Sequence, residues 1–368
     1  MAFRVVIAGG GTGGHVFPAL ALADGLMQRR PDSELLFVGS VGGLEQRLVP
    51  QRGYQLELLH SGKLRGMGPL SRLTALASLL PATARAVRLL RRFSPDVVVG
   101  LGGYASAPVV VAAGLLRLPV VLLEQNATPG TVNRGLARLA RVVVVAHGEA
   151  ARHLPAGKAR LLGNPIRPEL VRALEQPGEP GPPTLLVLGG SQGAHAVNEL
   201  MVGVAARLVE SIPDLRIHHQ CGAADHRWVE EAYAKIGPRA RVDPFVEEMG
   251  PALRCATLML GRSGATTLAE LCVAGLPALL IPYPHATDDH QAANAAELVQ
   301  AGGALMRRQE SLTEQTLACL LVGLLQDPER LERMGRAMKS CGRPHAADEI
   351  ARMLLEQFAP GPPRHGRS

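Results

Sequence analysis

The chain has 368 residues, of which 47% are apolar and only 3% aromatic, and its formal net charge at pH 7 is +7. This length exceeds the roughly 250–300 residues that one hydrophobic core supports, so we expect two domains. The apolar content excludes an intrinsically disordered chain, and the 41 Gly and 28 Pro follow no period, which excludes a collagen-like protein.

The positive charge is concentrated in the N-terminal part of the chain. Residues 1–164 carry 19 Lys and Arg against 8 Asp and Glu, a net of +11, whereas the remainder has a net of −4. A basic half predicts an anionic partner, such as a phosphorylated substrate, an anionic membrane surface or nucleic acid. Nucleic acid ranks last, because the chain has few aromatic side chains to stack on bases and no recognisable nucleic-acid module. We therefore expect no nucleic-acid partner.

Short β-branched runs alternate with longer amphipathic stretches in the first half. This alternation predicts parallel βαβ units and an open, doubly wound sheet. The expected strands are Arg4–Ala8, Leu35–Val38, Val97–Gly100, Val120–Glu124 and Val142–Ala146. The expected helices are Pro18–Gln28, Leu44–Gln51, Thr74–Arg92 and Pro108–Leu116.

The polar, Pro- and Gly-rich stretch Glu175–Pro183 predicts a linker, after which the alternation restarts. The expected later elements are strands Thr184–Leu188, Arg216–Gln220, Leu258–Leu260 and Ala278–Ile281, and helices Ala196–Leu208, Thr266–Ala274 and Ala346–Phe358. The predicted fold class is α/β, with two Rossmann-like doubly wound parallel-sheet domains facing each other across a cleft. The predicted division is a domain at 1–164, a linker region at 165–183, a domain at 184–344 and a disordered tail at 359–368.

The five cysteines are dispersed and form no C-x-x-C pair, which predicts reduced thiols rather than disulfides or a zinc site. We expect no signal peptide, because the first residues already have the pattern of a buried strand. The most apolar stretch, Ala105–Leu123, contains two prolines and one arginine and is too short to span a bilayer. We expect a soluble protein that at most attaches to a membrane surface.

Three glycine-rich loops follow directly after predicted strands. They are Gly9–Gly14, which precedes His15, then Gly100–Tyr104, and Gly189–Gly193. Glycines let the backbone approach a ligand closely, and the N-terminus of the next helix offers unpaired N–H groups to an anion. Three such loops at the carboxyl ends of strands predict a protein that holds two phosphorylated molecules, since a dinucleotide dehydrogenase needs only one.

A fourth group of motifs carries a family resemblance. The segments RSGATTLAE (262–270), GLPA (275–278) and HATDDHQAAN (285–294) resemble the donor-nucleotide motif of GT-B glycosyltransferases. Together with GGGTGGHVFPALALA, GLGGYASAP, LLEQNATPG, GNPIR and GGSQGAHAVN, they make the chain similar to family 28 of these enzymes from about Phe3 to Phe358. The resemblance implies an inverting hexosyltransferase that moves N-acetylglucosamine from UDP-N-acetylglucosamine (UDP-GlcNAc) to the C4 hydroxyl of the N-acetylmuramoyl sugar of lipid I, forming lipid II in peptidoglycan synthesis. It further implies that residues 1–164, with the helix at 345–358, bind lipid I and the membrane, and that residues 184–344 bind UDP-GlcNAc.

The donor site implied by the resemblance has groups for each part of the nucleotide sugar. Glu270 can accept both hydrogen bonds of a ribose diol, Ser191 and Gln192 can hold the diphosphate, and main-chain groups of Phe245 and Val246 read uracil. The complete expected set is Thr12, Gly13, Gly14, Asn126, Arg167, Ser191, Gln192, Phe245, Val246, Arg262, Ala265, Thr266, Thr267, Glu270, Gln291 and Asn294.

The acceptor site implied by the resemblance lies at the first two glycine loops. The expected diphosphate-binding residues are Gly10, Gly11, Thr12, Gly13, Gly14, Gly102, Gly103, Tyr104, Gln125 and Asn126. The attacking hydroxyl needs a general base. His15 is the first choice, because imidazole titrates near neutrality, and Glu124 at the end of an apolar strand is the alternative. His15 also has an ordinary interpretation, in which it caps its helix or orients a phosphate.

No metal cage is evident. The cluster His285, Asp288, Asp289 and His290 has suitable residue types, but the resemblance places it beside the sugar site, and GT-B enzymes stabilise the leaving group without a D-x-D metal motif. We expect no obligatory metal and no cofactor.

The segment 72–92 is the candidate for membrane contact. Leu73, Leu76, Leu79 and Leu80 share one helical face, and the basic residues around it are Arg72, Arg85, Arg88, Arg91 and Arg92. An apolar patch with a basic rim suits an anionic lipid surface, although the leucines of a single helix usually face the core. Pro81 is expected to break the segment. We expect peripheral attachment at the cytoplasmic face of the bacterial plasma (inner) membrane, with proteins of cell-wall or division complexes as further partners.

Three alternatives stay open at this stage. They are another GT-B transferase, a UDP-GlcNAc 2-epimerase of the same fold, and a non-catalytic subunit that binds a nucleotide sugar. An epimerase has no need for two glycine loops in the first half, and His15, Glu124 and Glu270 speak against a non-catalytic subunit.

Overall fold

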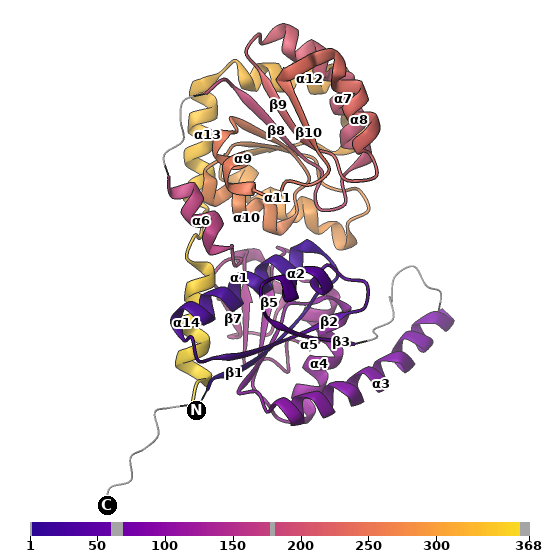
Figure 1. The fold of residues 1–368 in the computed structure, drawn as a ribbon, viewed down its shortest axis with the longest axis vertical. Helices are drawn as coiled ribbons and strands as arrows, with labels where there is room; N and C mark the ends of the chain where they lie inside the picture. The colour runs from indigo at the N-terminus through magenta and orange to yellow at the C-terminus, as the bar shows by residue number, and fades with distance from the viewer. Residues whose placement is uncertain (1, 60–68, 177–180, 361–368) are drawn as a thin grey trace, which may run out of the picture. The chain divides into compact units, whose positions relative to one another are not determined.

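The computed structural model describes residues 2–59, 69–176 and 181–360 (Figure 1). The chain divides into two compact units. The first combines Met1–Pro168 with His345–Ser368, and the second is Glu169–Pro344. The boundary falls inside the expected linker region 165–183 but before the stretch Glu175–Pro183, because the helix α6 (Pro168–Glu175) forms there and packs against Gly250 of the second unit.

The first unit contains a seven-stranded sheet in the order β3-β2-β1-β4-β5-β6-β7, with every neighbouring pair parallel. Its strands are β1 (Arg4–Ala8), β2 (Glu34–Ser40), β3 (Gln55–Leu59), β4 (Val97–Gly100), β5 (Val120–Glu124), β6 (Val142–Val145) and β7 (Ala159–Leu161). Its helices are α1 (Gly13–Arg29), α2 (Glu45–Gln51), α3 (Pro69–Phe93), α4 (Gly103–Leu115), α5 (Thr131–Leu136), the short η1 (Gly148–His153) and α14 (Ala346–Phe358).

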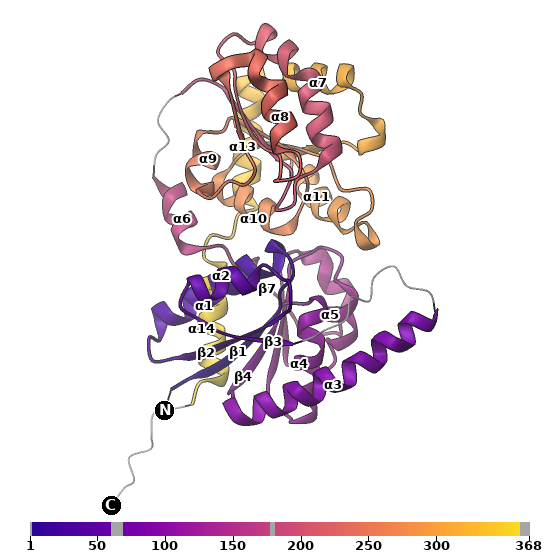
Figure 2. The same ribbon diagram turned by 45° about the vertical axis from the view of Figure 1, so that its right-hand side comes forward.

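Both faces of this sheet are covered by helices, as a parallel sheet requires. On one face, Val5 and Ile7 of β1 pack with α1, α2 and α14 in one hydrophobic cluster. On the other, Val6 and Ala8 of the same strand pack with α3 and α4 in a second cluster. Figures 1 and 2 show α14 beside α1, and α3 beside α4. Successive side chains of β1 therefore point to opposite faces of the sheet and contribute to two separate hydrophobic clusters.

The second unit contains a six-stranded parallel sheet in the order β10-β9-β8-β11-β12-β13. Its strands are β8 (Thr184–Leu188), β9 (Arg216–Gln220), β10 (Ala240–Asp243), β11 (Leu258–Gly261), β12 (Ala278–Leu280) and β13 (Ala304–Met306). Its helices are α6, α7 (His195–Ser211), α8 (His226–Tyr233), η2 (Ala234–Arg239), α9 (Met249–Cys255), α10 (Ala265–Ala274), η3 (Thr287–Asp289), α11 (His290–Gln300), η4 (Gln309–Ser311), α12 (Glu314–Leu325) and α13 (Pro328–Ser340).

Several expected boundaries were wrong. The helices α1 and α4 begin at Gly13 and Gly103, five residues before their expected starts, so the ends of two glycine loops are already helical. The expectation that Pro81 breaks its segment was also wrong, because α3 runs from Pro69 to Phe93 with Pro81 inside it. Proline removes one backbone hydrogen bond, and the buried Ala86 and Leu90 hold the helix against the sheet. The expected tail lies mostly outside the described residues.

The strand order places all three predicted glycine loops where doubly wound sheets bind ligands. The order reverses between β1 and β4 in the first sheet and between β8 and β11 in the second. Loops that leave neighbouring strands in opposite directions open a crevice at such a switch point. The first and second glycine loops follow β1 and β4, and the third follows β8.

Candidate functional site

The first glycine loop is built around a buried glutamate. Glu45, at the start of α2, is 1% exposed, and its carboxylate accepts hydrogen bonds from the Gly11 N–H at 2.8 Å and the Ser40 N–H at 2.8 Å. A Cβ atom on Gly10 or Gly43 would overlap this carboxylate. Gly11 itself adopts φ +91°, which favours glycine. Sequence reasoning missed Glu45, because only the packing of α2 against the loop reveals it.

His15 lies where the first and second glycine loops meet. A Cβ atom on Gly103 would lie 3.4 Å from His15 Cδ2 and 3.7 Å from the Gly10 carbonyl oxygen. Gly102 and Gly103 both have positive φ, which turns the chain tightly from β4 into α4. The structure therefore brings His15 together with both predicted acceptor loops. Tyr104 lies in the first turn of α4, and its side chain is outside the described residues.

Glu124, the alternative base, is 3% exposed and engaged on both oxygens. Oε1 accepts from the Asn126 N–H at 2.9 Å and from Asn126 Nδ2 at 3.2 Å. Oε2 accepts from the Gly130 N–H at 3.0 Å and from Asn133 Nδ2 at 2.9 Å. Four donors leave the carboxylate little capacity to take a proton from a substrate hydroxyl, and they fix the loop that carries Asn126. This arrangement favours His15, although the choice of base stays a prediction.

Two buried amides beside Glu124 have polar atoms without a protein partner among the described residues. Gln125 is 3% exposed, and neither its amide oxygen nor its nitrogen is hydrogen-bonded. Asn133 Nδ2 donates to the Leu123 carbonyl and to Glu124, while Asn133 Oδ1 accepts no hydrogen bond from the described protein atoms. Sequence reasoning missed Asn133, which lies next to Gly102.

Arg167, another expected donor-site residue, lies over the ring of Phe17, with the guanidinium carbon 4.8 Å from the ring centroid.

The third glycine loop packs on the residue that follows β9. Gly193 lies so close to the Cys221 carbonyl that no side chain fits there, and the Gly193 N–H closes a turn on the Gly190 carbonyl at 2.9 Å. Ser191 and Gln192 are exposed at the tip of this turn. The loop therefore presents its exposed residues at the N-terminus of α7, where N–H groups can meet an anion.

Arg262 is placed as a bracing residue. It is 9% exposed, and NH1 donates to the carbonyls of Ile281 and Pro282 at 3.1 Å each. NH2 donates to Gln309 Oε1 at 2.7 Å, and burial lowers the pKa of the guanidinium. These bonds join the ends of β11 and β12. Its expected role in neutralising the donor diphosphate stays a prediction.

The motif after β11 forms a closed cluster with α11. Asn294 is fully buried and donates to the Ser263 carbonyl at 3.4 Å, and the Ser263 hydroxyl donates to the Gln291 carbonyl at 2.8 Å. Gln291 Oε1 accepts from the Tyr283 N–H at 2.9 Å. The side chain of Asn294 therefore holds the loop from inside, and the expected contacts of Gln291 and Asn294 with the donor stay predictions. Glu270 is 7% exposed on α10.

Five further predicted donor residues lie in the second unit, whereas Thr12, Gly13, Gly14, Asn126 and Arg167 belong to the first. Ala265, Thr266 and Thr267 form the first turn of α10, so their N–H groups belong to a helix N-terminus. Phe245 is 40% exposed after β10, whereas Val246 is buried.

A buried polar network lies behind the third glycine loop. His219 of β9 is fully buried, with Tyr233 OH 3.0 Å from Nδ1 and Asn198 Oδ1 3.0 Å from Nε2. Asn198 donates through Nδ2 to the Cys221 carbonyl and to Asp225 Oδ2, so its oxygen faces a protonated Nε2. Burial lowers the pKa of His219 to about 4. The imidazole is therefore neutral and holds α7, α8 and β9 together.

One member of the cluster at 285–290, Asp289, forms an ion pair with Arg308. Asp289 accepts two hydrogen bonds from Arg308, at 2.8 and 2.5 Å, and hydrogen bonding to Arg308 lowers the pKa of its carboxyl group. In the part of the chain that the structure describes, no group of three or more His, Cys, Asp or Glu could hold a metal ion. The absence of an obligatory metal stays a prediction.

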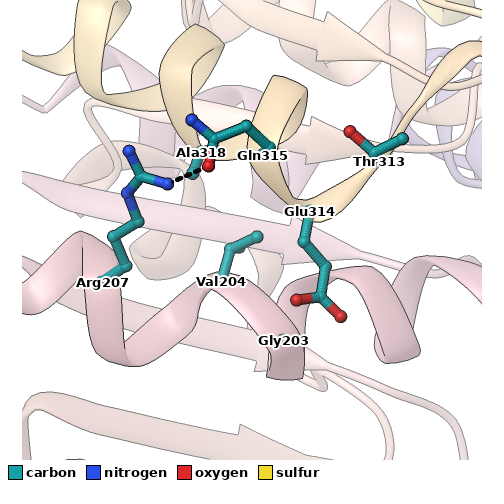
Figure 3. Close-up of a pocket in the computed structure, with 7 residues that line it drawn as sticks. All are labelled: Gly203, Val204, Arg207, Thr313, Glu314, Gln315 and Ala318. Carbon is teal, nitrogen blue, oxygen red and sulfur yellow. Dashed lines mark hydrogen bonds between the residues drawn. The ribbon is translucent and has the colours of Figure 1, made fainter.

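A separate hollow of about 370 Å³ lies between α7 and the start of α12 (Figure 3). Arg207 and Glu314 line it, and the Arg207 guanidinium donates to Gln315 Oε1. No residue predicted from the sequence borders it, so it adds nothing to the nucleotide site.

Comparison with known proteins assigns the family. The model of the glycosyltransferase family 28 N-terminal domain matches residues 5–145, and that of the family 28 C-terminal domain matches residues 184–350. The chain belongs to glycosyltransferase family 28. A curated relative from Anaeromyxobacter dehalogenans is 45% identical over 96% of this chain and 92% of its own length. It is named UDP-N-acetylglucosamine–N-acetylmuramyl-(pentapeptide) pyrophosphoryl-undecaprenol N-acetylglucosamine transferase.

Solved structures support the same assignment. The crystal structure of MurG from Acinetobacter baumannii is 31% identical, with a TM-score of 0.76 over 96% of this chain and all of that one. The UDP-GlcNAc 2-epimerase from Neisseria meningitidis has a TM-score of 0.67 over 97% of this chain and all of that one, at 14% identity. The epimerase thus shares the fold alone. This family 28 chain is a glycosyltransferase with the GT-B fold.

Proposed function

We propose that this chain transfers N-acetylglucosamine from UDP-GlcNAc to the C4 hydroxyl of the N-acetylmuramoyl sugar of lipid I, releasing UDP and forming lipid II. The observation that carries the proposal is the match to relatives with this named activity along almost the whole chain, with glycine loops at the switch points of both sheets.

The two units divide the substrates between them. The second unit binds UDP-GlcNAc: the third glycine loop takes the diphosphate, Glu270 the ribose, and the main chain at Phe245–Val246 the uracil. The first unit binds lipid I through the loops after β1 and β4, and Asn126 on the loop that Glu124 braces is an expected contact of the acceptor diphosphate. The basic excess of the first unit suits a diphosphate lipid.

The reaction is a single displacement with inversion. The acceptor C4 oxygen forms a bond to the anomeric carbon while the bond from that carbon to the β-phosphate oxygen breaks. UDP leaves with the electron pair, and the proton of the hydroxyl passes to a base. The N–H groups at the starts of α7 and α10 stabilise the negative charge on UDP.

His15 is the proposed base. It lies between the two acceptor loops, and Glu124 is already occupied by four donors. Glu124 then acts through Asn126 and Asn133, whose positions it fixes. The imidazole ring can take the hydroxyl proton without a metal ion.

We also propose peripheral attachment to an anionic lipid surface at the cytoplasmic face of the plasma membrane. On the described side chains of α3, Leu80 is 74% exposed, and Arg85, Arg88, Arg91 and Arg92 are exposed. No helix in the described ranges is both long and apolar enough to cross a bilayer. Leu73 and Leu76 of the expected patch lie outside the described side chains. Proteins of cell-wall or division complexes stay expected partners.

Acceptor-dependent release of UDP tests the proposal. Purified protein is incubated with UDP-GlcNAc, with and without a lipid I analogue, and UDP is measured by a coupled assay. We expect release only when the analogue is present, with one N-acetylglucosamine joined to the analogue per UDP. Release of UDP without the analogue, or conversion of UDP-GlcNAc into its epimer, would overturn the proposal.

A further inference from the structure

Gln220 is the last residue of β9, the strand between β8 and β10. It stands opposite Leu188 in one ladder and Asp243 in the other. Both neighbouring strands run directly into donor-site segments, since β8 leads to the third glycine loop and β10 to Phe245–Val246. One residue of one strand therefore borders both segments.

The Gln220 side chain hydrogen-bonds to both of them. It is 4% exposed, and its Nε2 donates to the Gly190 carbonyl at 3.0 Å and to the Pro244 carbonyl at 3.1 Å. Because an amide nitrogen carries two hydrogens, one group satisfies both carbonyls. The main chain adds to this bridge, since the Gly189 N–H donates to the Gln220 carbonyl at 3.2 Å.

These two carbonyls lie at the points where the chain turns into the third glycine loop and into the segment Phe245–Val246. Gly190 adopts φ +87°, and its carbonyl also accepts the Gly193 N–H, so it faces inward while the tip of the turn stays exposed. Pro244 has no N–H of its own to anchor the chain as it leaves β10. The bond from Gln220 holds this residue immediately before Phe245.

We infer that Gln220 is a positioning residue that sets the spacing between the diphosphate loop and the uracil-reading segment, so that a complete nucleoside diphosphate is bound at both ends at once. The inference rests on the proposed function in taking UDP as the ligand. Gln220 is not expected to touch the ligand. Its effect is on the ratio of two affinities, that for the complete nucleoside diphosphate and that for a nucleotide that lacks the second phosphate.

The test compares UDP with UMP by isothermal titration calorimetry on the full-length protein. Gln220→Glu has nearly the same shape but turns a carboxylate toward two carbonyl oxygens. We expect this variant to bind UDP about tenfold more weakly or worse, as expected for two lost hydrogen bonds. Its affinity for UMP should change by less than about twofold, because the uridine end is still read after the spacing is lost. The ratio of UDP to UMP affinity thus falls.

Gln326→Glu is the matched control, because Gln326 also donates to a main-chain carbonyl of the same unit, that of Ser211, but on the surface. It should bind both nucleotides as the wild type does. If Gln220→Glu does not fold, as judged by the fluorescence of Trp228, then Gln220→Met replaces it, with the same fall in the ratio expected. An unchanged ratio in the folded variant overturns the inference. Failure of the wild type to bind UDP would instead count against the proposed function.

Discussion

Glu45 puts a carboxylate directly beneath a loop that was expected to bind a diphosphate. The Gly11 N–H, one of the expected phosphate donors, already donates to Glu45. The Gly11 N–H is therefore already engaged within the protein, and we expect an anion to be bound by other groups of the two acceptor loops. Glu45 thus shapes the loop and also decides which of its amides face the ligand.

Substitution of Glu45 tests this at the residue scale. Glu45→Gln keeps the volume but turns an NH₂ group toward either Gly11 or Ser40. We expect the KM for a lipid I analogue to rise about tenfold while the KM for UDP-GlcNAc stays unchanged, because one backbone donor is lost from its acceptor. Steady-state kinetics with each substrate varied will show the split. Glu149→Gln, at an exposed ion pair with Arg152 of the same unit, is the control. Equal effects on both KM values would contradict the assignment.

Substitution of His15 tests the base. His15→Gln should lower kcat by about 10²- to 10⁴-fold, the usual contribution of a positioned base. The affinity for UDP should change little, since the groups expected to bind its uracil, ribose and diphosphate lie in the other unit. His153→Gln, at an exposed histidine of the same unit, should have wild-type kcat. A His15→Gln enzyme with kcat within threefold of the wild type would instead assign the proton to another group.

The pairing of Asp289 with Arg308 carries a prediction about metal dependence. A carboxylate already held by two charge-assisted hydrogen bonds is a poor ligand for Mg²⁺. Turnover should therefore persist in the presence of a strong chelator such as EDTA. Complete loss of activity, restored by Mg²⁺, would sink this prediction.

At the scale of elements, α3 serves the core and the surface with different faces. Ala86 and Leu90 are buried in the cluster beneath it, while Leu80 and the exposed arginines point to solvent. The sequence alone could not separate these faces, because both contain leucine at helical spacing. Pro81 lies inside the helix, so the apolar and basic groups stay on one continuous element.

Leu80→Asp should weaken binding to liposomes that contain anionic lipid roughly tenfold, because it loses one inserted leucine and adds a negative charge. Co-sedimentation with vesicles of mixed anionic and neutral lipid measures the effect. Leu115→Asp, at a leucine that is 69% exposed at the end of α4, is the control and should bind normally. If Leu80→Asp sediments as the wild type does, α3 is not the contact surface.

At the scale of the whole molecule, the features that could be predicted depend on residues close together in the sequence, and the features that were missed depend on residues far apart. Strand–helix alternation and glycine loops are local, so the positions of β1, β4, β5, β8 and β9 and the doubly wound class followed from the sequence. Glu45, Asn133 and Gln220 were missed because their partners belong to other strands or helices. Arg262 and Asn294 were predicted as donor-binding residues, but the contacts that turn their side chains inward are long-range and do not show in the sequence. Local pattern locates the loops, and packing decides what each side chain does there.

The second unit should lose stability in mild acid. Unfolded His219 binds a proton near pH 6.5, whereas the buried folded residue does so only near pH 4. Its pKa is lowered in the folded state, so the unfolding free energy falls as the pH drops through this window, by about 3 kcal/mol in all. His195 acts with the opposite sign, because its hydrogen bond to Asp225 raises its pKa, but it is exposed and its effect should be small.

Urea unfolding at pH 7 and at pH 5 measures how steeply the free energy of unfolding falls with pH. Trp228, the single tryptophan of the chain, packs against His195 and reports on the second unit alone. His219→Gln removes the titrating group and should flatten the pH dependence, even though it lowers stability at pH 7. A variant with the wild-type slope would show that other groups control acid sensitivity.

The helix α14 has a consequence for the order in which the chain folds during synthesis. Its Ile350 and Leu354 complete the cluster that covers one face of the first sheet, although some 175 residues of the other unit separate them from the rest of that unit. A chain emerging from the ribosome therefore holds every segment of the second unit before it can close the first. Until α14 is made, the apolar surface of α1 and β1 that it covers stays exposed. Synthesis that stops before residue 346 therefore leaves the N-terminal unit accessible to chaperones and proteases, even though all of its strands have been made.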